Sequence, residues 1–199
     1  MVNLTTGDTA LIVETCRQHG LLRNQAAYVL ATAFWETART MKPVREYGGE
    51  KYLRSKKYYP YVGMGYVQIT WLANYQKASK KLGVDFVKNP KLLLKPEYAA
   101  PILVIGSKEG WFTGKKLSDY ITLSKSDFKG ARRIINGTDK AAEIAKLAQE
   151  YDALLKASGY GEAAPVSDAP PSTDNRRSGL SAFLSFLALI VSKLLGRKS

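Results

Sequence analysis

One helix that is apolar around most of its circumference constrains the fold more than any other feature of this chain. It falls within residues 26–40, AAYVLATAFWETART, where Tyr28, Val29 and Phe34 would lie on different sides of a helix. Because a helix that is apolar on all sides is buried, we expect this segment to be a core helix. Helices are predicted over residues 7–19, 24–39, 71–82, 97–111, 127–135 and 139–158.

Residues 1–160 are expected to form one mainly α-helical domain with a small β-hairpin. The chain has 199 residues, of which 45% are hydrophobic, and this suffices for one domain of about 150 residues with an appendage. The composition changes near Gly159. Residues 161–178 are rich in Pro, Ser, Ala and Asp and lack periodic apolar positions, so they predict a flexible linker.

Two carboxylates in unlike surroundings are candidates for acid and base catalysis. Glu36 ends the apolar helix directly after Phe34 and Trp35, and partial burial there would favour the neutral form that a general acid needs. Glu46 lies in the glycine-rich string REYGG beside a positive charge, which favours the ionised form that a general base needs. Glu50 is the alternative base. From spacing alone, a glutamate near a helix C-terminus, such as Glu36, is more often an ordinary solvated surface residue.

Residues 63–70, GMGYVQIT, are expected to form a short strand beside these carboxylates. The two glycines permit close backbone approach, and Val67 and Ile69 then alternate with Gln68 and Thr70. Gln68 and Thr70 would therefore share one face of the strand. That face either contacts bulk water or holds sugar hydroxyls and an attacking water molecule.

Four strings occur in the order seen in the glycoside hydrolase family 19 chitinases and their phage endolysin relatives: ETART, PVREYGG, YYPYVGMGYVQITWLANY and ARRIINGTD. The chain resembles that family over residues 26–151, which implies a lysozyme-like helical fold. The resemblance also implies that Glu36 is the acid, that Glu46 is the base and that Thr70 holds the water. Substrate-binding positions are expected at Gln68, Asn74 and Asn136 by the resemblance, and at Tyr66 as an aromatic lining of a sugar cleft.

The reaction implied by the resemblance is inverting hydrolysis of a β-1,4-linked amino sugar polymer without a cofactor. Inverting enzymes hold their carboxyl groups about 6.5–9.5 Å apart so that water fits between base and sugar. Two positions depart from the family pattern. Trp35 stands where the family commonly has His, and Met64 stands where it commonly has Arg between the glycines, so substrate preference and local orientation can differ.

Net charge favours peptidoglycan over chitin as the substrate. The chain carries 30 Lys and Arg against 17 Asp and Glu, a formal charge of +13, which attracts a polyanion. Peptidoglycan is anionic and chitin is neutral. A chitinase and a non-catalytic wall-binding protein remain alternatives. A nucleic-acid partner is not expected, because no recognised binding motif is present and such a module explains neither Glu36 nor Glu46.

The chain has few candidate residues for metal binding or for nucleophilic catalysis. His19 is the only histidine and Cys16 the only cysteine, so no His/Cys ligand set and no internal disulfide are expected. We interpret His19 as a residue at the C-terminus of a helix and Cys16 as a small core residue.

The final segment, residues 179–199, predicts a C-terminal hydrophobic helix. Lys193 is the only charge within residues 179–195, a run at the lower edge of transmembrane length. A membrane-spanning helix is the main interpretation, with an interfacial helix or a soluble oligomerisation helix as alternatives. No cleaved N-terminal signal is apparent. We therefore expect an endolysin that begins in the host cytoplasm and reaches the inner membrane and periplasm through this segment or with a holin.

Overall fold

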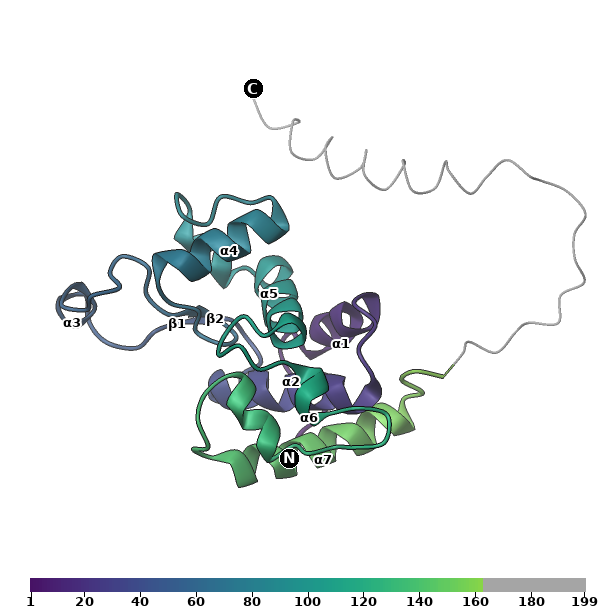
Figure 1. Cartoon of the computed structure of the whole chain (residues 1–199). Coiled ribbons are helices and arrows are strands. Elements are labelled where there is room, and N and C mark those ends of the chain that lie inside the picture. Colours follow the sequence, from purple (N-terminus) through teal and green to yellow (C-terminus); the bar gives the residue numbers. More distant parts are fainter. Residues whose placement is uncertain (163–199) are drawn as a thin grey trace, which may run out of the picture. The chain divides into compact units, whose positions relative to one another are not determined.

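The computed structural model describes residues 1–162, and these form one compact unit. Within them the chain is mainly helical, which confirms the predicted class (Figure 1). The elements follow in the order α1 (Thr9–Gln18), α2 (Arg23–Glu36), β1 (Val44–Arg45), α3 (Glu50–Arg54), β2 (Met64–Gly65), α4 (Leu72–Leu82), η1 (Pro90–Leu94), α5 (Pro96–Glu109), α6 (Leu117–Tyr120), η2 (Gly130–Ile134) and α7 (Ala141–Ala157).

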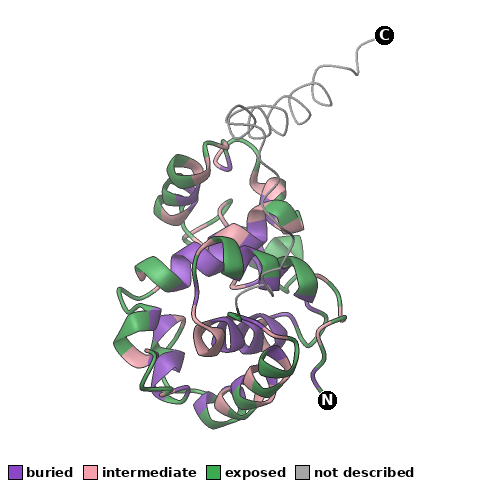
Figure 2. Ribbon diagram, turned by 90° about the vertical axis from the view of Figure 1, so that its right-hand side faces the viewer, coloured by how far each residue is buried: buried purple, intermediate pink, exposed green. Residues whose placement is uncertain are grey.

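Helix α2 is the core helix that the sequence predicts. All of its residues from Ala26 to Phe34 are buried. It packs along α7, and the two helices lie side by side in Figure 1. Burial elsewhere is concentrated on the inward faces of the helices, whose outer faces are exposed (Figure 2). Glu36, the last residue of α2, is thereby fixed at the end of the most deeply buried element.

Two hydrophobic clusters make up the core. The first surrounds α2 and takes side chains from α1, α5 and α7. The second includes Leu53, Met64, Tyr75 and Phe86, which come from the α3–α4 region and the segment after it. Helix α5 belongs to both, because Leu103 packs in the first cluster and Ile102 in the second. The partly buried Val67 also contacts both clusters, so residues 63–70 lie where the two clusters meet.

The expected strand over residues 63–70 is replaced by a short strand and a tight turn. Strand β2 pairs antiparallel with β1, with Val44 opposite Gly65 and Arg45 opposite Met64. A bridge between Met64 and Ile69 then closes a turn over residues 66–68. The strict alternation predicted for Val67, Gln68, Ile69 and Thr70 is wrong, because Gln68 adopts a left-handed backbone conformation with φ +53°.

Short helices account for most differences from the predicted elements. Helices α3 and α6 and the 3₁₀ helix η1 span only four or five residues each, too few to display a helical period. The helix predicted over residues 127–135 is the shorter 3₁₀ helix η2. The predicted linker and C-terminal hydrophobic helix lie outside the described residues. Within residues 1–162, no helix combines the length and apolar character needed to span a bilayer.

His19 follows α1 as its C-cap, which confirms the sequence interpretation. A helix C-terminus favours protonated histidine, yet its surroundings act in the opposite direction. Burial lowers the pKa of His19 below its ordinary 6.5, and the positive charges of Lys108 and Lys81 lower it further. The Lys108 ammonium donates a hydrogen bond to the His19 carbonyl at 2.6 Å.

We expect the single histidine to titrate below 6.5 in a proton NMR pH series. Because the pKa of His19 is lower in the folded chain than in the unfolded chain, the unfolded chain binds more protons just below pH 6.5. The contribution of His19 to the free energy of unfolding is therefore present above pH 6.5 and is lost as the pH falls through the folded-state pKa. Lys108→Ala is expected to raise the pKa of His19 by removing a nearby positive charge. A pKa at or above 6.5 in the wild type would contradict the packing of α1 against these lysines.

Candidate active site

Glu36 is held by a buried arginine from the far end of the domain. Arg132, in η2, donates from Nη1 to Glu36 Oε1 at 2.6 Å. The Arg132 side chain is 4% exposed and that of Glu36 is 22% exposed. The sequence-based expectation considered only the apolar neighbours of this carboxyl and did not include its cationic partner, Arg132.

Arg132 is itself fixed from two directions. Its Nε donates to the Asp139 carbonyl at 3.1 Å, after the chain leaves η2. The Tyr28 hydroxyl, from the middle of α2, donates to the carbonyl of Ala131 at 2.7 Å. Helix α2 therefore positions both the carboxylate and the backbone of the segment that carries its cationic partner.

Glu46 has a different set of partners. The Gly63 amide donates to Glu46 Oε2 at 3.0 Å, and the Tyr58 hydroxyl donates to Oε1 at 2.5 Å. The Glu46 amide in turn donates to the Gly63 carbonyl at 2.7 Å. Two neutral donors stabilise and orient a carboxylate without an adjacent ion pair. Glu46 is thus half-buried and held in one orientation.

The hydrogen bond to Glu46 also marks Tyr58 as part of this site. That bond, followed by burial and the carboxylate charge, raises the pKa of Tyr58 to about 12. The phenol therefore stays protonated and keeps donating throughout the neutral range. The Tyr58 ring packs edge to face against Trp71, with ring centroids 5.5 Å apart.

Trp71 is one of several exposed aromatic residues of this region, with Tyr47, Tyr52 and Tyr59. The residue is 50% exposed, and its backbone has φ +73° and ψ 142° at the start of α4. Such a conformation is strained for a residue with a side chain, and strained positions cluster at functional sites. Exposed tryptophan provides a flat apolar face of the kind that sugar rings cover. The sequence predicted neither Trp71 as a site residue nor the hydrogen bond from Tyr58 to Glu46.

Glu50, the alternative base, lies in a more solvated position. It begins α3, its side chain is 55% exposed, and it accepts from Arg45 Nη2 at 2.7 Å. Arg54 approaches its other oxygen at 3.8 Å. Glu50 is thus paired with two arginines at the surface. Glu46 is half-buried and is oriented by Tyr58 and Gly63, so the geometry favours Glu46 as the base.

Gln68 and Tyr66 contact protein groups in this structure. Gln68 Nε2 donates to the carbonyls of Val44 at 2.7 Å and Gly65 at 3.1 Å, which ties the turn to β1. The Tyr66 ring is buried in the first cluster, and its hydroxyl donates to Asp8 Oδ2 at 2.7 Å. Tyr66 therefore has a structural environment, and not the exposed aromatic face expected from the sequence.

Gly63 allows Glu46 and Gln68 to approach each other closely. A Cβ atom at this position would lie 2.9 Å from Gln68 Oε1 and 3.3 Å from Glu46 Cβ. A side chain at residue 63 would therefore displace both. This is the close approach that the glycine-rich string predicts.

Thr70, Asn74 and Asn136 are placed in two different settings. Asn74 Nδ2 donates to the Thr70 carbonyl at 2.7 Å, which orients the segment that leads into α4. The Thr70 hydroxyl makes no hydrogen bond to any residue within 1–162 and stays available to water. Asn136 is exposed, and its backbone N–H donates to the Arg132 carbonyl at 3.0 Å.

The site residues thus form two groups on one folded unit. One contains Glu36, Arg132 and Asn136, and the other contains Glu46, Tyr58 and Gln68. Within the described chain, no hydrogen bond or ion pair joins the two carboxylates to one another or to a common side chain. Each carboxylate has partners of a different chemical kind, a cation for Glu36 and two neutral donors for Glu46.

Removing the Arg132 charge is expected to destabilise the fold. Arg132→Met leaves Glu36 without its cation and the Asp139 carbonyl without its donor. Removing one partner of a buried ion pair lowers the free energy of unfolding by about 3–5 kcal/mol. Because Glu36 is partly exposed, we expect a loss at the lower end of this range, about 3 kcal/mol. Urea unfolding of the wild type and the variant measures it. The neighbouring Arg133, which is exposed, provides the control Arg133→Met, and equal losses in both variants would contradict the special role of Arg132.

A scan of protein-family models found no match to this chain, and a search of curated proteins found no relative.

Proposed function

We propose that the protein is a lysozyme-like endolysin of the glycoside hydrolase family 19 type. It hydrolyses β-1,4 glycosidic bonds of bacterial peptidoglycan by an inverting mechanism and so lyses the host cell. The observation that carries this proposal is the pair of half-buried carboxylates with unlike partners, Glu36 beside Arg132 and Glu46 beside Tyr58 and Gly63.

Glu46 is suited to activate water. Its two oxygens accept hydrogen bonds from two neutral donors, the Tyr58 hydroxyl and the Gly63 amide, which fix the orientation of the carboxylate. The Thr70 hydroxyl is proposed to hold the attacking water. Proton transfer from that water to Glu46 would generate the nucleophile, a step in which a positioned base contributes about 10²–10⁴-fold.

Glu36 is proposed to protonate the leaving oxygen. A sugar chain bound over this carboxyl would remove water from it and favour the neutral acid. When the proton leaves, negative charge develops on Glu36 at the position where Arg132 already lies 2.6 Å away. A preorganised cation that meets developing charge lowers the barrier to the step. Arg132 is therefore a positioning and electrostatic partner of the acid.

Charge supports peptidoglycan as the substrate. The formal charge of +13 favours a polymer that carries carboxylates. Purified Gram-negative peptidoglycan and chitin hexamer, offered separately at equal bond concentration, distinguish the two substrates. We expect new reducing ends chiefly from peptidoglycan, identified by mass spectrometry. Cleavage of chitin alone would indicate a chitinase, and binding to peptidoglycan without cleavage would indicate a wall-binding protein.

The proposed location is the inner membrane after synthesis in the cytoplasm. Residues 179–199 are the proposed anchor on the strength of their sequence. Deletion of residues 179–199 is expected to keep the protein from floating with vesicles in a density gradient, so that it stays in the dense bottom fraction, without loss of hydrolysis of purified peptidoglycan. Continued flotation of the truncated protein would contradict the anchor, and a holin would then be the proposed route.

A further inference from the structure

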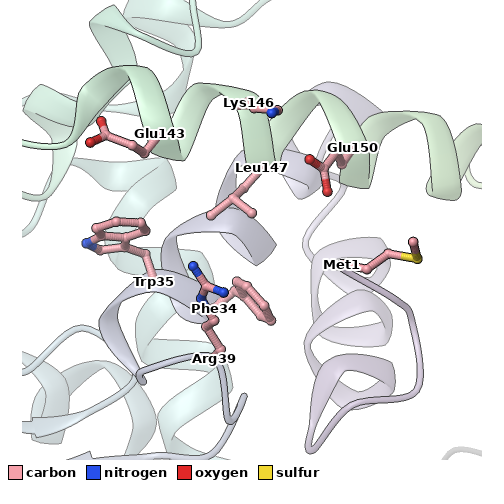
Figure 3. A pocket seen from close by; sticks show the side chains of 8 residues that line it. All are labelled: Met1, Phe34, Trp35, Arg39, Glu143, Lys146, Leu147 and Glu150. Atoms are coloured by element: carbon pink, nitrogen blue, oxygen red, sulfur yellow. The ribbon is translucent and has the colours of Figure 1, made fainter.

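A cavity of about 700 Å³ lies between the end of α2 and residues 143–150 of α7. Its volume falls in the range of about 300–1,000 Å³ that is usual for small-molecule sites. Trp35 and Arg39 line it from the α2 side, and Leu147 projects from α7 toward them (Figure 3). Neither Glu36 nor Glu46 lines the cavity, so it is separate from the two carboxylates.

The lining of this cavity combines an apolar floor with charges of both signs. Trp35 and Leu147 are partly buried and pack against the first cluster. The cations are Arg39 and Lys146, and the anions are Glu143 and Glu150. Positions 143, 146, 147 and 150 recur at intervals of three and four along α7, so they share one helix face.

Most of these charges have no partner in the described part of the chain. Glu143 lies 3.6 Å from Lys140. Arg39, Lys146 and Glu150 take part in no ion pair or side-chain hydrogen bond within residues 1–162. A surface that carries two cations and two anions around an apolar floor is complementary to a ligand that itself carries both signs of charge.

Arg39 is presented by an unusual turn. The residues after α2 adopt left-handed conformations, with φ +49° at Ala38 and +70° at Arg39. The turn is closed by a hydrogen bond from the Arg39 amide to the Phe34 carbonyl at 2.7 Å. It holds Arg39 over the same end of α2 that carries Trp35 and Glu36. A ligand in the cavity would therefore lie next to the turn of helix that carries the proposed acid.

We propose that this cavity binds the stem peptide of peptidoglycan, a short peptide with several carboxylates and an ammonium group. This inference rests on the proposed function. Arg39 and Lys146 pair with the peptide carboxylates, Glu150 and Glu143 pair with its ammonium group, and Trp35 and Leu147 contact its aliphatic parts. A neutral sugar would leave all four charges unused. Peptide recognition at this position favours peptidoglycan strands over chitin.

Titration calorimetry on the full chain with the Glu36→Gln substitution tests the proposal, because we expect that variant to bind without turnover. The ligands are a disaccharide tetrapeptide with a diamino acid, and the same disaccharide without its peptide. We expect the peptide-bearing ligand to bind at least about tenfold tighter, because even one charged hydrogen bond contributes about 1.5 kcal/mol and about 1.4 kcal/mol is tenfold in affinity. Lys146→Ala is expected to weaken its binding about tenfold and to leave the peptide-free ligand unchanged.

Lys156 provides the matched control, since it is an exposed lysine on α7 that does not line the cavity. Lys156→Ala is expected to bind both ligands as the parent does. Equal affinity for the two ligands, or equal weakening by Lys146→Ala and Lys156→Ala, would overturn the proposal. Glu150→Gln gives a second test if Lys146→Ala changes the circular dichroism spectrum, and unchanged binding of the peptide-bearing ligand by Glu150→Gln would also count against it.

Failure of the proposed function is distinguishable from failure of this inference. If wild type cuts no glycan and the peptide-bearing ligand still binds more weakly after Lys146→Ala, the cavity is a peptide site on a wall-binding protein. If wild type cuts peptidoglycan and peptide-free glycan at the same rate, with equal affinities, hydrolysis stands and the peptide site does not.

Discussion

Glu36→Gln is expected to lower the rate of peptidoglycan hydrolysis at least about hundredfold, because an amide cannot donate the proton that the leaving oxygen requires. The substitution is close to isosteric, and the new amide oxygen can still accept from Arg132 Nη1, which lies 2.6 Å from Glu36 Oε1. Release of new reducing ends from purified peptidoglycan measures the rate. Binding of the glycan is expected to persist, so the loss should appear in kcat.

Glu36→Gln needs a control for folding, because it removes one partner of the ion pair with Arg132. The Glu36→Gln substitution would leave the buried guanidinium of Arg132 without its counter-charge, so some loss of stability accompanies the loss of activity. Circular dichroism and urea unfolding at the assay temperature establish that the variant is folded. Activity within about threefold of wild type in a folded variant would refute the assignment of Glu36 as the acid, since a positioned general acid contributes more than that.

Glu46→Gln is expected to cause a loss of similar size, at least about hundredfold, since an amide cannot take the proton of the attacking water. Glu50→Gln is the matched comparison, because Glu50 lies four residues further along and is paired with Arg45 and Arg54 at the surface. We expect Glu50→Gln to retain most of the wild-type rate. The same reducing-end assay compares the two variants.

If Glu50→Gln lost much more activity than Glu46→Gln, the base would be Glu50 and not Glu46. Loss of activity in both variants would indicate that the Arg45–Glu50 pair supports the loop around Glu46. Retention of activity in both would remove the two-carboxylate mechanism for this protein. The three outcomes differ in the reducing-end assay, provided that each variant is folded.

The helices could be predicted where the chain carries both a periodic pattern and an end signal. Helix α4 was expected over 71–82 and spans Leu72–Leu82, because Gly83 closes it in a left-handed conformation with φ +67°. Helix α5 ends in the same way at Gly110. Helix α2 was expected to extend to Arg39 but ends at Glu36. The reason is that Ala38 and Arg39 adopt left-handed backbone conformations, which no glycine or proline at these positions predicts.

The partners of the carboxylates could not be predicted from local sequence. Arg132 follows Glu36 by 96 residues, and no spacing rule connects them. In the sequence Arg132 is one of two adjacent arginines in the string ARRIINGTD, and nothing local links it to Glu36. Tyr58 was one of several tyrosines, and its bond to Glu46 depends on how the α3 segment folds back to Gly63.

The turn at residues 66–68 shows how tertiary contacts override a local pattern. Alternating polar and apolar residues predict a strand, yet Tyr66 is drawn into the first cluster while Met64 and Ile69 belong to the second. The side-chain amide of Gln68 bonds the carbonyls of Val44 and Gly65. These contacts offset the cost of the left-handed backbone at Gln68.

The stereochemistry of hydrolysis tests the two-carboxylate mechanism most directly. Proton NMR of a soluble β-1,4-linked peptidoglycan fragment, recorded within the first minutes of cleavage by wild type, identifies the anomer released before it equilibrates. Activation of water by Glu46 opposite the acid Glu36 predicts that the α anomer appears first. First appearance of the β anomer would show retention through a double displacement and would contradict the mechanism, and the absence of any new anomeric signal would contradict glycoside hydrolysis itself.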